Sequence, residues 1–128
     1  MSSHARFPVV IGVGQIANKE PERIVHPTEL MREAVLAAVS DAHADVLAHI
    51  GAVRSAPLSI FGDERGGEMV AELLGLPAGA RSEWAYSGAA PQLHMSAACA
   101  EIAIGAVDAV LLVGGIADAS YSLSLIHI

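Results

Sequence analysis

The chain has 128 residues and a formal net charge of −7, and its length suits one domain with its own core, or half of a double one. A hydrophobic content of 53% with only 16% charged residues excludes a disordered chain, and 7 scattered Lys and Arg residues exclude a nucleic-acid partner. No apolar run reaches about 18 residues and the N-terminus lacks a signal-peptide pattern, so we expect a cytoplasmic protein with no membrane partner.

The first half of the chain predicts two strands around one helix. Residues 7–14, FPVVIGVG, form an apolar run that ends in glycine, which is typical of a strand buried on both faces of a parallel sheet. A helix is predicted from Pro27 to about His43, because apolar residues recur there at helical spacing. Residues 50–60 predict a second strand, which Pro57 places at an edge or a bend.

The second half repeats the alternation of strand and helix. A short helix is predicted over residues 66–74, with Gly75 as its stop signal, and a third strand over residues 80–86. A long helix over residues 91–104 and a fourth strand over residues 107–113 follow. This order predicts an α/β fold with a mostly parallel sheet and helices on both of its faces.

The helix over residues 91–104 is small or apolar in nearly every direction, and such a helix is normally covered on all sides. We therefore expect that a covering layer is missing from this chain. Cys99 lies among alanines in this helix and is interpreted as a small apolar filler. The apolar or small residues of the helix are Leu93, Met95, Ala97, Ala98, Cys99, Ala100, Ile102, Ala103 and Ile104.

Residues 120–128, at the C-terminus, end abruptly. Residues 120–128 stop without a turn, a cap or a polar terminus after a glycine-rich loop has begun. Our hypothesis is that residues 1–119 form an incomplete half-domain and residues 120–128 a tail, because the reading frame is truncated or because its last residues are foreign, as when a fragment runs into adaptor-derived DNA.

Gly12, Gly14 and Ala17 match the G-x-G-x-x-A fingerprint of dinucleotide-binding proteins, and they follow a predicted strand. The fingerprint requires a helix that opens directly after the glycines, whereas here the next helix is predicted only at Pro27. An NAD(P)-binding oxidoreductase is therefore kept as an alternative, and a plain turn is the preferred interpretation. We predict no cofactor-binding residues.

Ser87 and Gly88 lie where the third strand turns into the long helix, a position at which helix N–H groups favour an anion and nucleophiles are often found. The sequence there is not G-x-S-x-G, so Ser87 is interpreted first as a turn or capping residue. The six histidines show no metal-binding spacing, so no metal site is predicted. His94, near the start of the helix, is a core, interface or pocket residue.

Several segments together resemble the N-terminal half of the thiolase superfamily, in particular thiolase-like acetyl-CoA acetyltransferases. The resemblance covers residues 8–117 in order. Its most specific part is the long helix followed by Gly105, Asp108 and LLVGG. The segments are PVVIGVGQ, HPTELMREAVLAAVSDA, AELLGLP, SGAAPQ and SAACAEIAIGAVDAVLLVGG.

The resemblance implies half of a layered α-β-α-β-α fold, an acyl-CoA substrate, a role in lipid metabolism and a homo-oligomer. It also implies a nucleophilic cysteine at the start of the long helix, a position that here falls at Gly88 or Ser87, while Cys99 lies three turns too far along. We expect an acyltransferase fragment that is inactive by itself, or a serine-based variant. The alternative is a non-catalytic acyl-CoA-binding or scaffold homologue.

Overall fold

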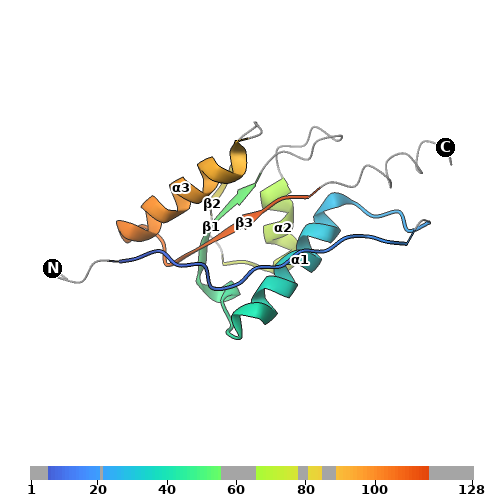
Figure 1. Ribbon diagram of the computed structural model, residues 1–128, viewed down its shortest axis with the longest axis horizontal. Coiled ribbons are helices and arrows are strands. Elements are labelled where there is room, and N and C mark those ends of the chain that lie inside the picture. The colour runs from blue at the N-terminus through green and yellow to red at the C-terminus, as the bar shows by residue number, and fades with distance from the viewer. Residues whose placement is uncertain (1–5, 21, 56–65, 78–80, 85–88, 116–128) are drawn as a thin grey trace.

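The computed structural model describes residues 6–20, 22–55, 66–77, 81–84 and 89–115, and of residues 81–84 only the backbone. Strands and helices alternate along these residues (Figure 1). The elements in chain order are α1 (Pro27–Ala42), a 3-10 turn (Leu47–His49), β1 (Ile50–Ser55), α2 (Gly66–Leu74), β2 (Arg81–Trp84), α3 (Ala90–Ala103) and β3 (Ala109–Val113).

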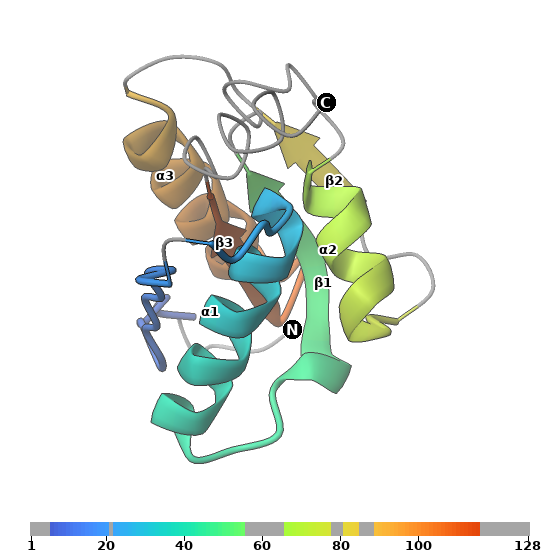
Figure 2. The same ribbon diagram turned by 90° about the vertical axis from the view of Figure 1, so that its right-hand side faces the viewer.

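The three described strands form one parallel sheet in the order β2-β1-β3. Ser55, the last residue of β1, lies beside Trp84 of β2 and Val113 of β3 in the register. Helix α3 covers one face of the sheet, and α1 and α2 cover the other (Figures 1 and 2). The predicted α/β fold with a parallel sheet and helices on both faces is confirmed.

Local signals set the ends of the helices. Pro27 opens α1, and the side chain of His26 accepts a hydrogen bond from the Thr28 N–H, which satisfies one of the N–H groups left free at a helix start. Gly75 and Gly105 follow α2 and α3 with φ values of 62° and 77°. Glycine adopts this left-handed conformation without steric cost, so both helices end where the sequence predicts.

The prediction of a strand over residues 7–14 is wrong. These residues belong to no strand of the described sheet, and the segment reaches α1 instead. A Cβ atom on Gly12 would lie 2.3 Å from the Ala38 carbonyl oxygen, and one on Gly14 would lie 2.2 Å from that of Ala34. The glycines therefore allow the backbone to pack directly on the helix, which a side chain would prevent.

The core lies between the sheet and the α1–α2 layer. Met31 and Val35 of α1 meet Val70 of α2, and all three side chains are buried. Leu111 and Val113 of β3 pack against this cluster, so alternate residues of β3 face α1 and α2. The amphipathic spacing that predicted α1 therefore corresponds to one buried stripe.

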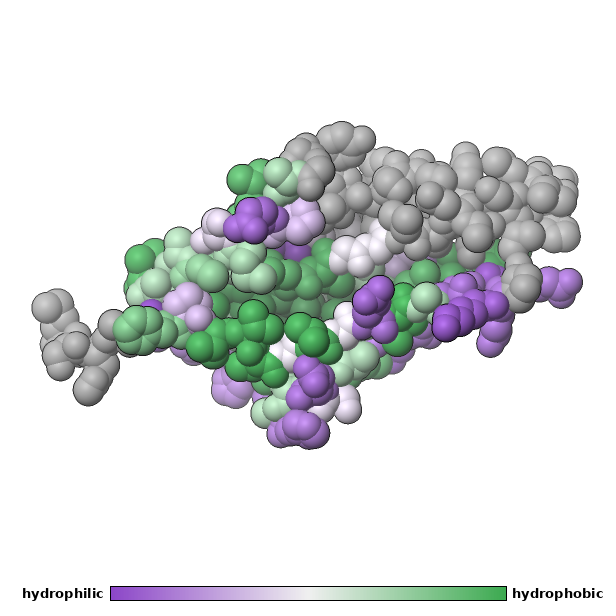
Figure 3. All heavy atoms as spheres, viewed as in Figure 1, coloured by the Kyte–Doolittle hydropathy of each residue, from purple (hydrophilic) through white to green (hydrophobic). Residues whose placement is uncertain are grey.

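On the opposite face of the sheet, several apolar side chains of α3 are exposed to solvent. Leu93 of α3 is 54% exposed and Met95 is 38% exposed, although Ala90, His94 and Ala98 are buried against the sheet. Apolar side chains extend from α3 to the N-terminal segment in the space-filling view (Figure 3). Apolar patches of this kind mark surfaces that are covered by a partner or by further chain. Within the described residues, no helix has the length and apolar character that crossing a membrane would need.

Candidate functional site at the carboxyl edge of the sheet

The three strands end at one edge of the sheet, called here the carboxyl edge, and α1, α2 and α3 all begin there (Figures 1 and 2). Strand β1 lies in the middle, with β2 on one side and β3 on the other. Open parallel sheets bind their ligands outside the carboxyl ends of the strands, where the strand order reverses in this way. The partial positive charge at the start of each helix favours negatively charged groups at the same edge.

No side chain at Ala89, which precedes the helix, caps the first turn of α3, and the first turn contains no acidic residue. Pro91 removes one of the N–H groups that would need a partner. The remaining N–H groups of the first turn have no side-chain cap at Ala89, so the helix start can interact with an anion or a carbonyl oxygen.

His94 joins α3 to the end of β1. Its side chain lies on the buried stripe that also contains Ala90 and Ala98, and its Nε2 atom is 2.9 Å from the Ser55 carbonyl oxygen. A carbonyl oxygen only accepts hydrogen bonds, so Nε2 carries the proton and donates it. In the neutral ring Nδ1 is then the acceptor nitrogen.

A buried ion pair forms a second connection between the same two elements. The Arg54 guanidinium of β1 donates to Glu101 Oε1 of α3 through Nε, at 3.1 Å, and through Nη2. Only 15% of the Arg54 side chain and 14% of the Glu101 side chain are exposed. A pair with so little solvent is sensitive to the loss of either partner, because the remaining charge stays buried. The ion pair and the His94 hydrogen bond together fix α3 relative to the carboxyl edge.

The Ser55 hydroxyl is the one buried polar side-chain atom without a hydrogen-bond partner in the described part of the chain. Ser55 lies beside Val113 in the register, and Val113 packs against the Met31 cluster, so the hydroxyl faces the α1–α2 layer. Its face is opposite to that of Arg54, which reaches α3. The carboxyl edge therefore has a polar group on each face.

The predicted turn residues Ser87 and Gly88 lie outside the described residues, between β2 and α3. Cys99 is half-buried in the second half of α3, away from the start of the helix. No group of three or more His, Cys, Asp or Glu side chains among the described residues could hold a metal ion. The tail, residues 120–128, also lies outside the described residues.

Gly12 and Gly14 do not form a phosphate-binding turn. They lie against carbonyl oxygens of the middle and end of α1, whereas a pyrophosphate requires the N–H groups of a helix start. The negative ends of these peptide dipoles would repel a phosphate.

The sequence analysis did not single out Arg54, Glu101 or Ser55. A signal was present, because Arg54 is the one charged residue of β1 and Glu101 the one charged residue of α3. Two opposite charges in otherwise apolar elements are most stable when they meet. Nothing in the sequence separates Ser55 from the other serines, since its lack of a partner depends on the packed structure.

No protein-family model and no curated protein matches this sequence. Solved structures match the fold, and two of them are described here. A monomeric SCP2-thiolase-like protein type 1 from Mycobacterium smegmatis is 30% identical, with a TM-score of 0.72 over 85% of this chain and 23% of that protein. An acetyl-CoA acetyltransferase from Syntrophomonas wolfei is 22% identical, with a TM-score of 0.67 over 85% of this chain and 28% of that enzyme.

The chain thus spans about a quarter of each of these two proteins, and the matched part includes most of its own length. The parallel sheet, the helices on both of its faces and the long apolar α3 agree with what the order of apolar segments in the sequence predicted. The chain has the fold of the thiolase superfamily.

Proposed function

We propose that this chain is the N-terminal part of a thiolase-like acyl-CoA acyltransferase, and that it supplies the carboxyl edge and the start of α3 to the active site of a longer protein. The observation that carries the proposal is the first turn of α3. It has no capping side chain at Ala89, it begins directly after residues 87–88, and the His94 hydrogen bond holds it to β1.

The chemistry expected of this edge is binding of the acyl thioester. The N–H groups at a helix start stabilise the negative charge that develops on a thioester oxygen during acyl transfer. A nucleophile at residue 87 or 88 would lie next to these groups. The acid and base groups that complete acyl transfer would come from the rest of the protein, so the isolated chain is expected to be inactive.

Cys99 is unsuited to the nucleophile's role. It lies nine residues after Ala90, which places it about 13 Å along the helix from the first turn. At that distance the helix start neither activates the thiol nor stabilises the thioester oxygen. The complete protein is therefore proposed to use Ser87, or to bind acyl-CoA without covalent chemistry as a scaffold.

The partners follow from the same proposal. Acyl-CoA would be a substrate rather than a resident cofactor, in the setting of lipid metabolism. The exposed apolar side of α3 favours a further layer of protein that covers this helix. That layer would come either from the same polypeptide or from another subunit of a homo-oligomer. One of the two structural neighbours is described as monomeric, which favours a layer from the same polypeptide.

Acyl labelling tests the proposal. The purified chain and the product of the complete parent reading frame are each incubated with acetyl-CoA and acetoacetyl-CoA, and intact mass, labelled peptides and turnover are measured. We expect turnover or a label on Ser87 only in the longer protein, and loss of the label in Ser87→Ala but not in the matched control Cys99→Ala. Acyl-CoA binding without a label favours the scaffold, and turnover by the 128-residue chain contradicts the fragment proposal.

A further inference from the structure

A histidine occupies the capping position of α1. The Nδ1 atom of His26 lies 3.2 Å from the Thr28 backbone nitrogen and 2.8 Å from Thr28 Oγ1. Helices usually place Ser, Thr, Asp or Asn at this position, and the side-chain oxygen atoms of those residues accept a hydrogen bond at any pH near neutrality. An imidazole nitrogen accepts a hydrogen bond only while it carries no proton. The cap on α1 therefore exists in one protonation state of His26.

The hydrogen bonds fix which ring nitrogen carries the proton. A backbone N–H only donates, so Nδ1 of His26 is the acceptor and the proton of the neutral ring is on Nε2. When the ring gains a second proton, Nδ1–H faces the Thr28 N–H, and two donors oppose each other. The Thr28 hydroxyl then accepts from Nδ1–H. The imidazolium charge also lies at the positive end of the α1 dipole, which disfavours it.

Water replaces this cap poorly, because the first turn of α1 is buried. Thr28 is 4% exposed, and Pro27 is fully buried. A buried N–H group that loses its acceptor costs the free energy of its desolvation. A Cβ atom on Gly115 would lie 2.7 Å from Met31 Cγ and 3.3 Å from the Pro27 carbonyl oxygen, so this part of α1 packs on the residues that follow β3. A change in the first turn therefore reaches the carboxyl edge.

The charged side chains near the ring come from the preceding segment and from α1. Arg23 forms an ion pair of 2.9 Å with Glu33. Glu20 and Glu29 also act electrostatically on the Arg23 guanidinium. Glu29 lies in the first turn but is exposed, and an exposed carboxylate attracts an imidazolium weakly. Residues 114–115 at the end of β3 are glycines and add no charge, so the loss of the cap dominates when the ring gains a proton.

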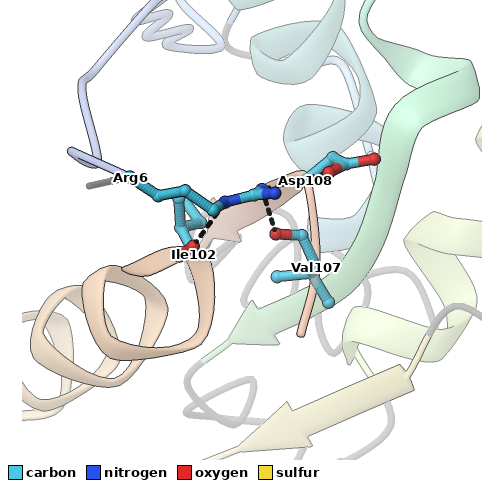
Figure 4. Close-up of polar contacts among 4 residues, drawn as sticks. All are labelled: Arg6, Ile102, Val107 and Asp108. Atoms are coloured by element: carbon cyan, nitrogen blue, oxygen red, sulfur yellow. Dashed lines mark hydrogen bonds and ion pairs between the residues drawn. The ribbon is translucent and has the colours of Figure 1, made fainter. Parts of the chain in front are cut away.

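Histidine is the side chain whose ordinary charge change falls between pH 5 and 8, whereas Arg, Asp and Glu ordinarily keep their charges in this range. The cluster around Arg6 is of the second kind. Its guanidinium donates to the Ile102 and Val107 carbonyls at 2.9 and 3.2 Å (Figure 4). It also forms an ion pair of 3.0 Å with Asp108. The His94 hydrogen bond is donated by an Nε2–H that both forms of the ring carry, so these contacts form a constant background to the cap on α1.

We propose that His26 is a pH-sensitive cap, which closes the first turn of α1 when the ring is neutral and opens this turn when the ring gains a proton. The cap contributes to stability at pH 8, and this contribution is lost as the pH falls to 5. Opening the turn loosens its packing on Gly115 and, with it, the carboxyl edge. The device depends on the packing of α1 and not on acyl transfer.

Urea unfolding of the full chain at pH 8 and at pH 5 tests the proposal. His26→Asn is the control, because the amide oxygen of asparagine accepts from the Thr28 N–H at both pH values. At pH 8 the two proteins should unfold at similar urea concentrations. Between pH 8 and pH 5 the unfolding equilibrium constant should rise about fivefold more in the unsubstituted chain, which corresponds to a cap of about 1 kcal/mol. The other histidines titrate in both proteins, so their effects cancel.

An equal pH dependence of the two proteins would overturn the proposal. His26→Ala, which has no cap at either pH, provides a second comparison. At pH 5 the unsubstituted chain should be no more stable than this variant. If it stays as far above His26→Ala at pH 5 as at pH 8, the imidazolium also stabilises the helix start, and the proposed cap is wrong.

NMR separates local opening of the turn from a general loss of stability. As the His26 ring titrates, the Cα shifts of residues 28–31 should move toward their values in an unfolded chain, and the Gly115 amide should shift with the same midpoint. Neither change should occur in His26→Asn. A first turn that stays helical, or a Gly115 amide that does not respond, would overturn the connection between the cap and the carboxyl edge.

Discussion

The ion pair between Arg54 and Glu101 provides the sharpest test of the packing of α3 on the sheet. Replacing Glu101 by Gln keeps the volume of the side chain but removes its charge. Both Arg54 donors bind the same oxygen of Glu101, so the neutral amide weakens two charge-assisted hydrogen bonds at once. The Arg54 charge then stays between β1 and α3 without its counter-charge.

The expected magnitude follows from the burial of the pair. Breaking a fully buried ion pair costs about 3–5 kcal/mol, because the remaining charge is not solvated. Both side chains keep about a seventh of their surface in solvent, at 15% and 14%, which screens part of this cost. We therefore expect Glu101→Gln to lower the free energy of unfolding by about 3 kcal/mol, which corresponds to roughly 10–15 °C in Tm.

Urea unfolding followed by circular dichroism measures this change, with an unchanged slope as the check that the transition stays comparable. The matched control is Asp108→Asn, which neutralises the exposed pair with Arg6, whose side chains are 44% and 75% exposed. An exposed pair contributes about 0–1 kcal/mol, so the control should shift the midpoint little. The double variant Arg54→Met with Glu101→Leu should recover much of the loss, because it leaves no buried charge.

Equal shifts of the midpoint for Glu101→Gln and Asp108→Asn would refute the reasoning. That result would mean that water reaches Arg54 and Glu101 as freely as it reaches the exposed pair. The fixed position of α3 at the carboxyl edge would then depend on the His94 hydrogen bond and apolar contacts alone.

Three further substitutions test single positions, each by the midpoint of urea unfolding. Ser55→Ala removes a buried hydroxyl that has no hydrogen-bond partner in the described part of the chain, and it should stabilise the chain by about 1 kcal/mol; a loss of stability would mean that the hydroxyl has a partner in solution. Gly75→Ala should cost about 1 kcal/mol, because its φ of 62° opposes the change, while no described atom beyond its two chain neighbours lies within 4 Å of the added Cβ; Gly114→Ala, with equal space among the described residues and no positive φ, is the control, and similar effects of the two would contradict this cause. His26→Ala should cost about 1 kcal/mol through loss of the cap on Thr28, whereas His26→Asn should retain most of the stability; equal losses would show that the cap contributes nothing.

Local chemistry made the helices predictable. Pro27 starts α1, and Gly75 and Gly105 end α2 and α3, because proline and glycine act on the backbone dihedral angles of their own position. The alternation of helices with apolar runs also predicted the parallel sheet. These features depend on only a few neighbouring residues, which is why they can be predicted from the sequence.

The segment over residues 7–14 shows the limit of prediction from local sequence. An apolar run predicts that a segment prefers to be buried, but it does not name the partner, because strand pairing joins residues that are far apart in the chain. In the structure Gly12 and Gly14 bring this segment onto α1 instead. The expectation for Ser87 and Gly88 stays a prediction, since both residues lie outside the described part of the chain.

By itself the sequence determined the type and order of the helices and strands from Pro27 onward, the ends of the helices and the resemblance to the thiolase superfamily. Only the tertiary structure paired Arg54 with Glu101, across 47 residues, and directed the His94 ring to the Ser55 carbonyl, across 39 residues. It also left the Ser55 hydroxyl without a hydrogen-bond partner among the described residues. Such contacts depend on how the sheet and the helices pack in three dimensions, and the free energy of a buried charge or hydrogen bond depends on the solvent that this packing excludes.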